Sequence, residues 1–171
     1  MTARQVLVYP DPILKQVAAP VQEDELERCA RALVDTMRSF ERCVGLAAPQ
    51  IGELVRVVAV DVSEHPKAET SNGLLVLANP RITEAEGSQV AREGCLSIPD
   101  LTANVRRATR IVVAHAGGEL ESSGFEARCL QHELDHLDGV LFLDRVESLV
   151  DDVFRRKTYS DVPSERGPRA G

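Results

Sequence analysis

The sequence lacks a long apolar run and an excess of basic residues, and each absence excludes a class of protein. No stretch approaches the roughly 18 apolar residues that a helix needs to cross a bilayer, and residues 1–5 lead into the first apolar segment without a secretory stretch. Acidic residues outnumber basic ones by 27 to 20, which gives a formal net charge of −7 and argues against binding to a phosphate backbone. We therefore expect a cytoplasmic protein with no membrane contact and no direct recognition of nucleic acid.

The sequence also lacks internal repeats, low-complexity tracts and an interdomain linker. With 171 residues, of which 43% are hydrophobic, it is long enough for one domain with a sizeable core and too short for two ordinary ones. Residues 155–171 contain two prolines, two glycines and many charges, with almost nothing apolar to bury. We predict a single domain over residues 1–154, followed by a flexible tail over residues 155–171.

Disulfide bonds are not expected, although the chain has four cysteines. Their spacings are wide, no secretory segment precedes them, and a chain of this length does not need cross-links to fold. A reduced cysteine can fill a core, attack a substrate or bind a metal, so composition leaves the role of each thiol open. The four are Cys29, Cys43, Cys95 and Cys129.

Hydrophobic spacing predicts two helices and several strands. Residues 25–40 place apolar side chains three and four apart behind an acidic start, as in an amphipathic helix, and a second helix is predicted over residues 125–138. Short β-branched or aliphatic runs predict strands at residues 55–62, 74–78 and 110–114. Gly117-Gly118 then predicts a hairpin turn into a further strand at residues 119–122. Strands grouped in the first two thirds, with helices outside them, indicate an α+β fold rather than alternating βαβ units.

The second predicted helix carries the most informative pattern, a His-Glu-x-x-His motif at residues 132–136. Residues four apart lie on one helix face, so His132 and His136 can direct their imidazoles at one cation while Glu133 lies beside an open coordination position. This arrangement is typical of metal hydrolases. Because two histidines and a glutamate also occur on ordinary solvent-exposed helices, the motif alone leaves that alternative open.

A hydrolytic metal site usually has three protein ligands and one position for water, so a third ligand is needed. Candidates by type are the cysteines, Asp61, Glu64, His65 and His115. We favour Cys95, because Gly94 before it and Pro99 shortly after it indicate an irregular backbone that could direct a thiolate and nearby amides into a cleft. The loop and turn positions of His65 and His115 predict solvated side chains.

Residues 45–52 form a small, apolar segment with one side-chain amide. Small residues would let a substrate backbone approach closely, and Gln50 could donate a hydrogen bond to an oxyanion. A tight turn before the strand at residues 55–62 is the alternative interpretation. Taken alone, the segment favours the turn.

Together, these three segments resemble the peptide deformylases, which remove the formyl group from the N-terminal formylmethionine of new proteins. That family is marked by G-φ-G-φ-A-A-x-Q, E-G-C-L-S and Q-H-E-x-D-H segments in this order, where φ is an apolar residue; the counterparts here are residues 43–50, 93–97 and 131–136. The resemblance implies an α+β fold with antiparallel or mixed sheets around a central helix that carries the metal motif. It also makes residues 1–154 a catalytic metallohydrolase domain.

The resemblance further implies a role for each residue of the site. One divalent metal ion, Fe²⁺ in the cell with Zn²⁺, Ni²⁺ or Co²⁺ as substitutes, would be bound by Cys95, His132 and His136. Glu133 would act as general base and then as general acid, while the Gln50 side chain and the Leu96 backbone N–H would stabilise the oxyanion. The residues that bind the formylmethionyl peptide would be Val44, Gly45, Phe125, Arg128 and Cys129.

The sequence departs from the family pattern at Cys43, where the family usually has glycine. If the family needs that glycine because its backbone has a positive φ, the backbone of Cys43 is strained. If the family needs it because a side chain would take up space, the thiol of Cys43 narrows the approach to the site. Near the metal motif, Asp135 could orient a ligand histidine, but a surface ion pair is the more common role of such an acid. We therefore leave Asp135 and Asp138 out of the catalytic set.

Two other functions are compatible with these motifs. One is a different metal amidase or peptidase, and the other is a non-catalytic metal-binding module. Glu133 and Gln50 argue against the second, because a purely structural site needs neither. Besides the formylmethionyl peptide, a transient contact with the ribosome is among the expected partners.

Overall fold

The computed structural model describes residues 2–157. Its helices are α1 (Glu23–Arg38) and α2 (Gly124–Leu137), with short 3₁₀ helices at Pro12–Lys15, Ala48–Ile51 and Phe142–Arg145. Its strands are β1 (Gly45–Ala47), β2 (Val57–Val60), β3 (Leu75–Ala78), β4 (Arg81–Glu86), β5 (Gln89–Cys95), β6 (Ile98–Arg107), β7 (Arg110–His115), β8 (Gly118–Ser123) and β9 (Val153–Arg155). Within this range, neither helix has the length and apolar character needed to cross a membrane.

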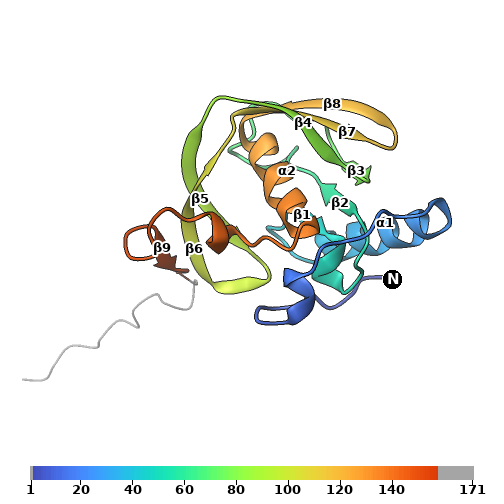
Figure 1. The fold of residues 1–171 in the computed structure, drawn as a ribbon, viewed down its shortest axis with the longest axis horizontal. Coiled ribbons are helices and arrows are strands. Elements are labelled where there is room, and N and C mark those ends of the chain that lie inside the picture. Colours follow the sequence, from blue (N-terminus) through green and yellow to red (C-terminus); the bar gives the residue numbers. More distant parts are fainter. Residues whose placement is uncertain (1, 158–171) are drawn as a thin grey trace, which may run out of the picture.

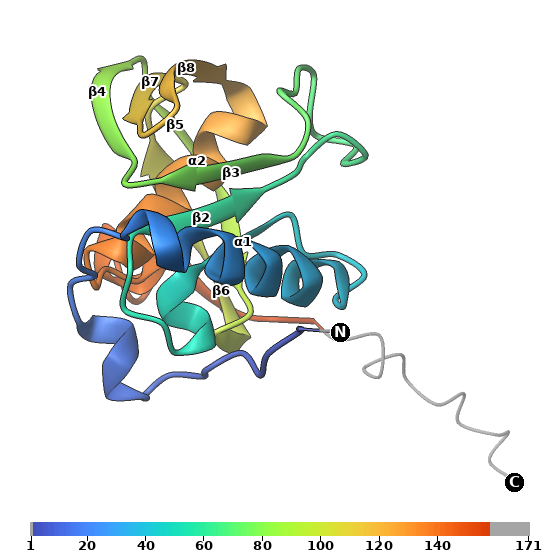
Figure 2. The same cartoon turned by 90° about the vertical axis from the view of Figure 1, so that its right-hand side faces the viewer.

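Antiparallel three-stranded sheets surround α2 (Figures 1 and 2). In the described residues, their strand orders are β1-β2-β3, β4-β7-β8 and β5-β6-β9. Figure 1 shows α2 in the middle, with β5 and β6 on one side of it and the β1-β2-β3 sheet on the other. This arrangement confirms the α+β class and the expected sheets around a central helix.

The two helices differ in how they are buried. One face of α1 packs on β1 and β2, where Leu33 and Met37 share a core cluster with Leu46 and Val57, and its acidic first turn is exposed. Helix α2 is buried over twelve of its fourteen residues. The pattern-based expectation that helices lie outside the strands is thus correct for α1 and wrong for α2, because polar side chains of α2 find buried partners instead of water.

The predicted strands are confirmed as β2, β3, β7 and β8, but the longest hairpin, β5–β6, was not predicted. Strand β9 was not predicted either. It pairs with β6, with Leu101 opposite Arg155, so the ordered chain continues past the predicted start of the tail at residue 155. Backbone hydrogen bonds to a sheet edge need no apolar side chains, and composition therefore missed this strand. The rest of the predicted tail, residues 158–171, lies outside the described residues.

Candidate metal centre

Cys95, His132 and His136 converge in the interior of the domain. Their potential ligand atoms lie within 4.8 Å of one another, and all three side chains are buried. Cys95 Sγ is 3.3 Å from His136 Nε2, and burial lowers the pKa of His136 well below its usual value, which keeps this imidazole neutral. A cysteine sulfur and two histidine ring nitrogens are donor types that Zn²⁺ and Fe²⁺ both accept, so this cluster fits a divalent metal ion.

Local structure explains why these three side chains meet. His132 and His136 are one turn apart on α2, as their spacing predicts. Cys95 ends β5, where the pairing of β5 with β6 shifts register between Gly94 and Cys95. The irregular backbone expected around Cys95 is therefore present, and it turns the thiol toward the helix.

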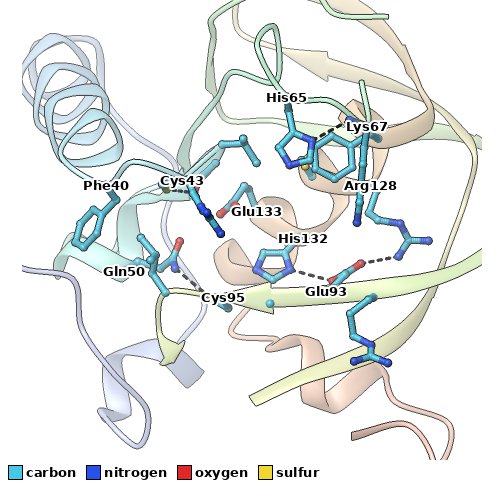
Figure 3. Close-up of a pocket in the computed structure, with 18 of the residues that line it drawn as sticks. Phe40, Cys43, Gln50, His65, Lys67, Glu93, Cys95, Arg128, His132 and Glu133 are labelled. Carbon is cyan, nitrogen blue, oxygen red and sulfur yellow. Dashed lines mark hydrogen bonds and ion pairs between the residues drawn. The ribbon is translucent and has the colours of Figure 1, made fainter. Parts of the chain in front are cut away.

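Glu93 fixes the orientation of His132, a function that sequence analysis did not assign to it. The carboxylate of Glu93 is 3.0 Å from His132 Nδ1 and accepts a hydrogen bond from Arg128 Nη1 at 2.8 Å (Figure 3). It also accepts a hydrogen bond from Arg107 Nε at 2.9 Å. Burial alone would raise the pKa of Glu93, but hydrogen bonds from His132 and Arg107 lower it to about 2. With Nδ1 held by a carboxylate, Nε2 of His132 is left for a metal.

Asp135 belongs to the same buried network, so its expected role as a surface partner is wrong. It accepts hydrogen bonds from Arg107 and from Arg145, the latter at 2.7 Å between Nη2 and Oδ1, and it is buried. Asp138 does form the expected exposed ion pair, at 2.7 Å from Arg56. Pairing with two guanidinium groups compensates the desolvation of Asp135. The sequence of the helix alone does not reveal these partners.

Glu133 lies beside the cluster without belonging to it (Figure 3). Among the described residues its buried Oε2 has no hydrogen-bond partner, and burial raises the pKa of Glu133 to about 7. A Cβ placed on Gly45 would lie 2.6 Å from Glu133 Oε1. Gly45 therefore provides the space that this carboxylate occupies.

Gln50 presents its amide nitrogen to the cluster. Its Oε1 accepts a hydrogen bond from the Ala47 backbone N–H at 2.9 Å, while Nε2 donates to Ser97 Oγ at 3.1 Å and lies 3.4 Å from Cys95 Sγ. The segment is also a turn, because the 3₁₀ helix Ala48–Ile51 ends at Gly52 with a φ of 81°. The predicted turn is therefore present, and it holds the Gln50 amide beside the cluster.

A cavity of about 550 Å³ opens beside these residues. The expected catalytic residues that line it are Gln50, Leu96 and Glu133. The expected substrate-binding residues all line it as well: Val44, Gly45, Phe125, Arg128 and Cys129. The structure thus brings together segments that are far apart in the sequence.

The two histidines outside the cluster, His65 and His115, differ in their surroundings. His65 was expected to be solvated, but its ring stacks on Phe125, with the centroids 4.3 Å apart, and lines the cavity. No sequence signal marked it, because its partner lies 60 residues away in another element. His115 lies at the end of β7, where its Nδ1 accepts a hydrogen bond from the Gly117 N–H at 3.1 Å.

Cys43 is not strained. Among residues 2–157, the non-glycine residue with a positive φ is Asn79, so the alternative based on backbone strain is excluded. The thiol donates a hydrogen bond to the Gly45 carbonyl at 3.1 Å and lines the cavity. Burial raises its pKa to about 12, which keeps it protonated. The other alternative stays open, in which the side chain of Cys43 takes up space beside the site.

Comparison with known proteins agrees with this geometry. Residues 3–152 match the family described as Polypeptide deformylase. The peptide deformylase of Thermodesulfovibrio yellowstonii is 38% identical over 92% of this chain and 97% of its own length, and that of Acidobacterium capsulatum is 44% identical over 92% and 94%.

Solved structures give the same result. The class I type b peptide deformylase from Acinetobacter baumannii bound to Met-Ala-Ser has a TM-score of 0.76 at 36% identity, covering 84% of this chain and 99% of that one. The Thermotoga maritima enzyme has a TM-score of 0.75 at 36% identity, covering 85% and 99%. The chain therefore belongs to the peptide deformylase family, whose members are metal-dependent hydrolases that remove N-formyl groups.

Proposed function

We propose that this protein hydrolyses the N-formyl group of the N-terminal formylmethionine of newly made polypeptides and releases formate. The observation that carries the proposal is the position of Glu133 beside a Cys-His-His cluster to which it does not belong. This buried carboxylate has one oxygen without a hydrogen-bond partner among residues 2–157. A structural metal site closes with four protein ligands and needs no such neighbour. The non-catalytic metal-binding module is therefore disfavoured.

The residues that would hold the metal are Cys95, His132 and His136. A bound divalent ion supplies Lewis-acid polarisation of the formyl carbonyl and makes water more acidic. Fe²⁺ is the ion that the resemblance implies for the cell, and this donor set also accepts Zn²⁺, Ni²⁺ and Co²⁺. Because the thiolate of Cys95 is oxidisable, an iron-loaded enzyme should lose activity in air.

Protein side chains and one backbone N–H would transfer the proton and stabilise the oxyanion. Glu133 accepts a proton from the attacking water as the water oxygen bonds to the formyl carbon, and it delivers this proton to the departing amine as the C–N bond breaks. Gln50 Nε2 and the Leu96 N–H donate hydrogen bonds to the formyl oxygen while it carries negative charge. The products are formate and a peptide with a free amino group.

The peptide would lie extended between Val44-Gly45 and the end of β5, hydrogen-bonded as an added strand. Phe125, Cys129 and the alkyl stem of Arg128 would form the pocket for methionine. Only that stem is available, because the Arg128 guanidinium donates to Glu93 and to the Val105 and Gln89 carbonyls. The Acinetobacter baumannii enzyme was solved with Met-Ala-Ser bound, which supports a peptide that begins with methionine as the ligand. The cytoplasmic location and the ribosome contact stay predictions.

The test is anaerobic purification with metal analysis and an assay of formate release from formyl-Met-Ala-Ser. We expect about one divalent ion per chain and stoichiometric formate. A peptide with a blocked N-terminus and no formyl group serves as the comparison substrate. Cleavage of its internal bonds without formate release from the first peptide would favour the alternative, a different metal peptidase.

Replacing Gln50 with alanine is expected to lower kcat about 100-fold with metal content unchanged, because one donor to the oxyanion is lost. Ser97→Ala is the matched control, since it removes the other buried partner of Gln50 Nε2 but no donor to the substrate. We expect less than a threefold effect from it, estimated from the modest net value of one hydrogen bond. Equal losses in the two variants would mean that the amide acts only on the fold.

Replacing Cys43 with glycine is expected to change which formylated first residue the enzyme prefers in its substrate. Removing the thiol widens the approach to the cavity, so kcat/KM for a formylated residue longer than methionine should rise about fivefold relative to formylmethionine. Cys43→Ser keeps nearly the same bulk and should leave the ratio unchanged. An unaltered ratio in Cys43→Gly removes the case for a role of Cys43 in specificity.

A further inference from the structure

The cavity has a basic rim, although the chain as a whole is acidic. The formal net charge is −7, yet Lys67, Arg92 and Arg156 line the cavity. In residues 2–157, none of these three side chains takes part in an ion pair. Arg128 differs, because Glu93 neutralises it at 2.8 Å. We call Lys67, Arg92 and Arg156 the basic rim.

Neutral groups of the described part of the chain hold Arg92 in place. From β5, its Nε donates to Asn104 Oδ1 at 3.1 Å and its Nη1 to Thr102 Oγ1 at 3.3 Å, both on β6. Its guanidinium lies over the Phe154 ring of β9, 3.6 Å from the centroid. These contacts orient the side chain without cancelling its charge, so a carboxylate that binds here meets a preorganised cation.

Arg156 lies against the strand that would receive the substrate. Its backbone N–H donates to the Asp100 carbonyl at 2.8 Å, which continues the pairing of β9 with β6. Its Nη2 lies 2.1 Å from the point that a Cβ of Gly94 would occupy. Because Gly94 has no side chain, the guanidinium reaches the backbone next to Cys95, beside the cluster.

We propose that the basic rim selects formylated peptides with acidic side chains in the positions that directly follow formylmethionine. The proposal rests on the proposed function, in which the formylated residue enters the cavity and the next residues pass along the end of β5. An extended chain advances about 3.3 Å per residue, so these residues leave the cluster past Gly94, where Arg156 lies. Arg92, two residues earlier on β5, and Lys67, from the loop between β2 and β3 beside His65 (Figure 3), extend the positive surface.

The test compares two peptides with amidated C-termini, formyl-Met-Asp-Glu-Ala and its neutral isostere formyl-Met-Asn-Gln-Ala. At low ionic strength, we expect kcat/KM to be about fivefold higher for the acidic peptide, as two exposed ion pairs allow. The difference should lie in KM, because the rim holds the peptide equally before and during reaction. In about 1 M salt the ratio should fall toward one, since the Debye length is then roughly 3 Å.

Variants identify the source of the preference. Arg92→Gln and Arg156→Gln should each lower the acidic-to-neutral ratio about twofold, and the triple variant that also carries Lys67→Gln should abolish the preference. Arg31→Gln, at an exposed arginine of α1 paired with Glu27, is the matched control and should leave the ratio at the wild-type value. A wild-type ratio of one, or a preference that survives in the triple variant, overturns the proposal and leaves deformylation standing. No formate from either peptide overturns the proposed function, and this proposal with it.

Discussion

Replacing Glu133 with glutamine is expected to lower kcat for formate release about a thousandfold, the usual size of a lost general base. Glutamine has the shape of glutamate and fits the same space beside Gly45, but it cannot accept a proton from water. Metal content should stay at the wild-type level, because Glu133 is not part of the Cys-His-His cluster. The measurement is steady-state formate release on the metal-loaded enzyme, together with metal analysis of the same sample.

The stability of this variant separates catalysis from folding. Burial raises the pKa of Glu133 to about 7, so at neutral pH the fold holds a carboxylate whose desolvation is poorly compensated. Glu133→Gln removes that cost, and its Tm should equal or exceed that of the wild type. Glu147→Gln, at an exposed acid paired with Arg106, should change neither property. A Glu133→Gln enzyme that retains its metal and full activity would refute the assigned role.

The sequence predicted those parts of the fold that have a local apolar period. Helix α1 has such a period, strands β2, β3 and β7 are local apolar runs, and β8 was predicted from the turn at residues 117–118 before it; the structure confirms all five. Strands β5 and β6 lack a regular apolar period, because Glu93 and Arg107 are buried in them as well as apolar residues such as Val105. The hydrophobic pattern did not predict the central position of α2, because this helix also buries polar and charged residues. Only the family resemblance implied that position.

The candidate site was likewise predictable in its local parts and not in the parts that depend on distant residues. The clustering of Cys95, His132 and His136 could be anticipated because two of them share a helix face and the third lies in an unusual local sequence. The groups that support them could not, because each partner lies far along the chain. Glu93 is 14 residues from Arg107 and 39 from His132, and a single sequence contains no signal that joins them.

Glu93→Gln is expected to have the second largest effect, on stability and metal binding together. In the wild type, Glu93 compensates Arg107 and Arg128 and orients His132 through Nδ1. A neutral amide leaves buried guanidinium charge only partly compensated, which should cost about 3–5 kcal/mol in the free energy of unfolding. Loss of the anionic acceptor on His132 should weaken metal affinity about 10- to 100-fold.

Urea unfolding of the metal-free protein measures the first effect, and metal competition with a chelator measures the second. Asp138→Asn, which breaks the partly exposed pair with Arg56, is the control and should cost less than about 1 kcal/mol. Equal unfolding free energies of wild type and Glu93→Gln at pH 7 would contradict the role of the network.

The pH dependence gives an independent check on the Glu93 network. The pKa of Glu93 is lowered from 4.5 to about 2, so the folded state favours the charged carboxylate. Its contribution is therefore fully present above the unfolded pKa and is lost as pH falls toward the folded one. The difference in unfolding free energy between wild type and Glu93→Gln should shrink between about pH 5 and pH 2. A difference that stays constant over this range would mean that the loss arises from altered packing and not from the charge of Glu93.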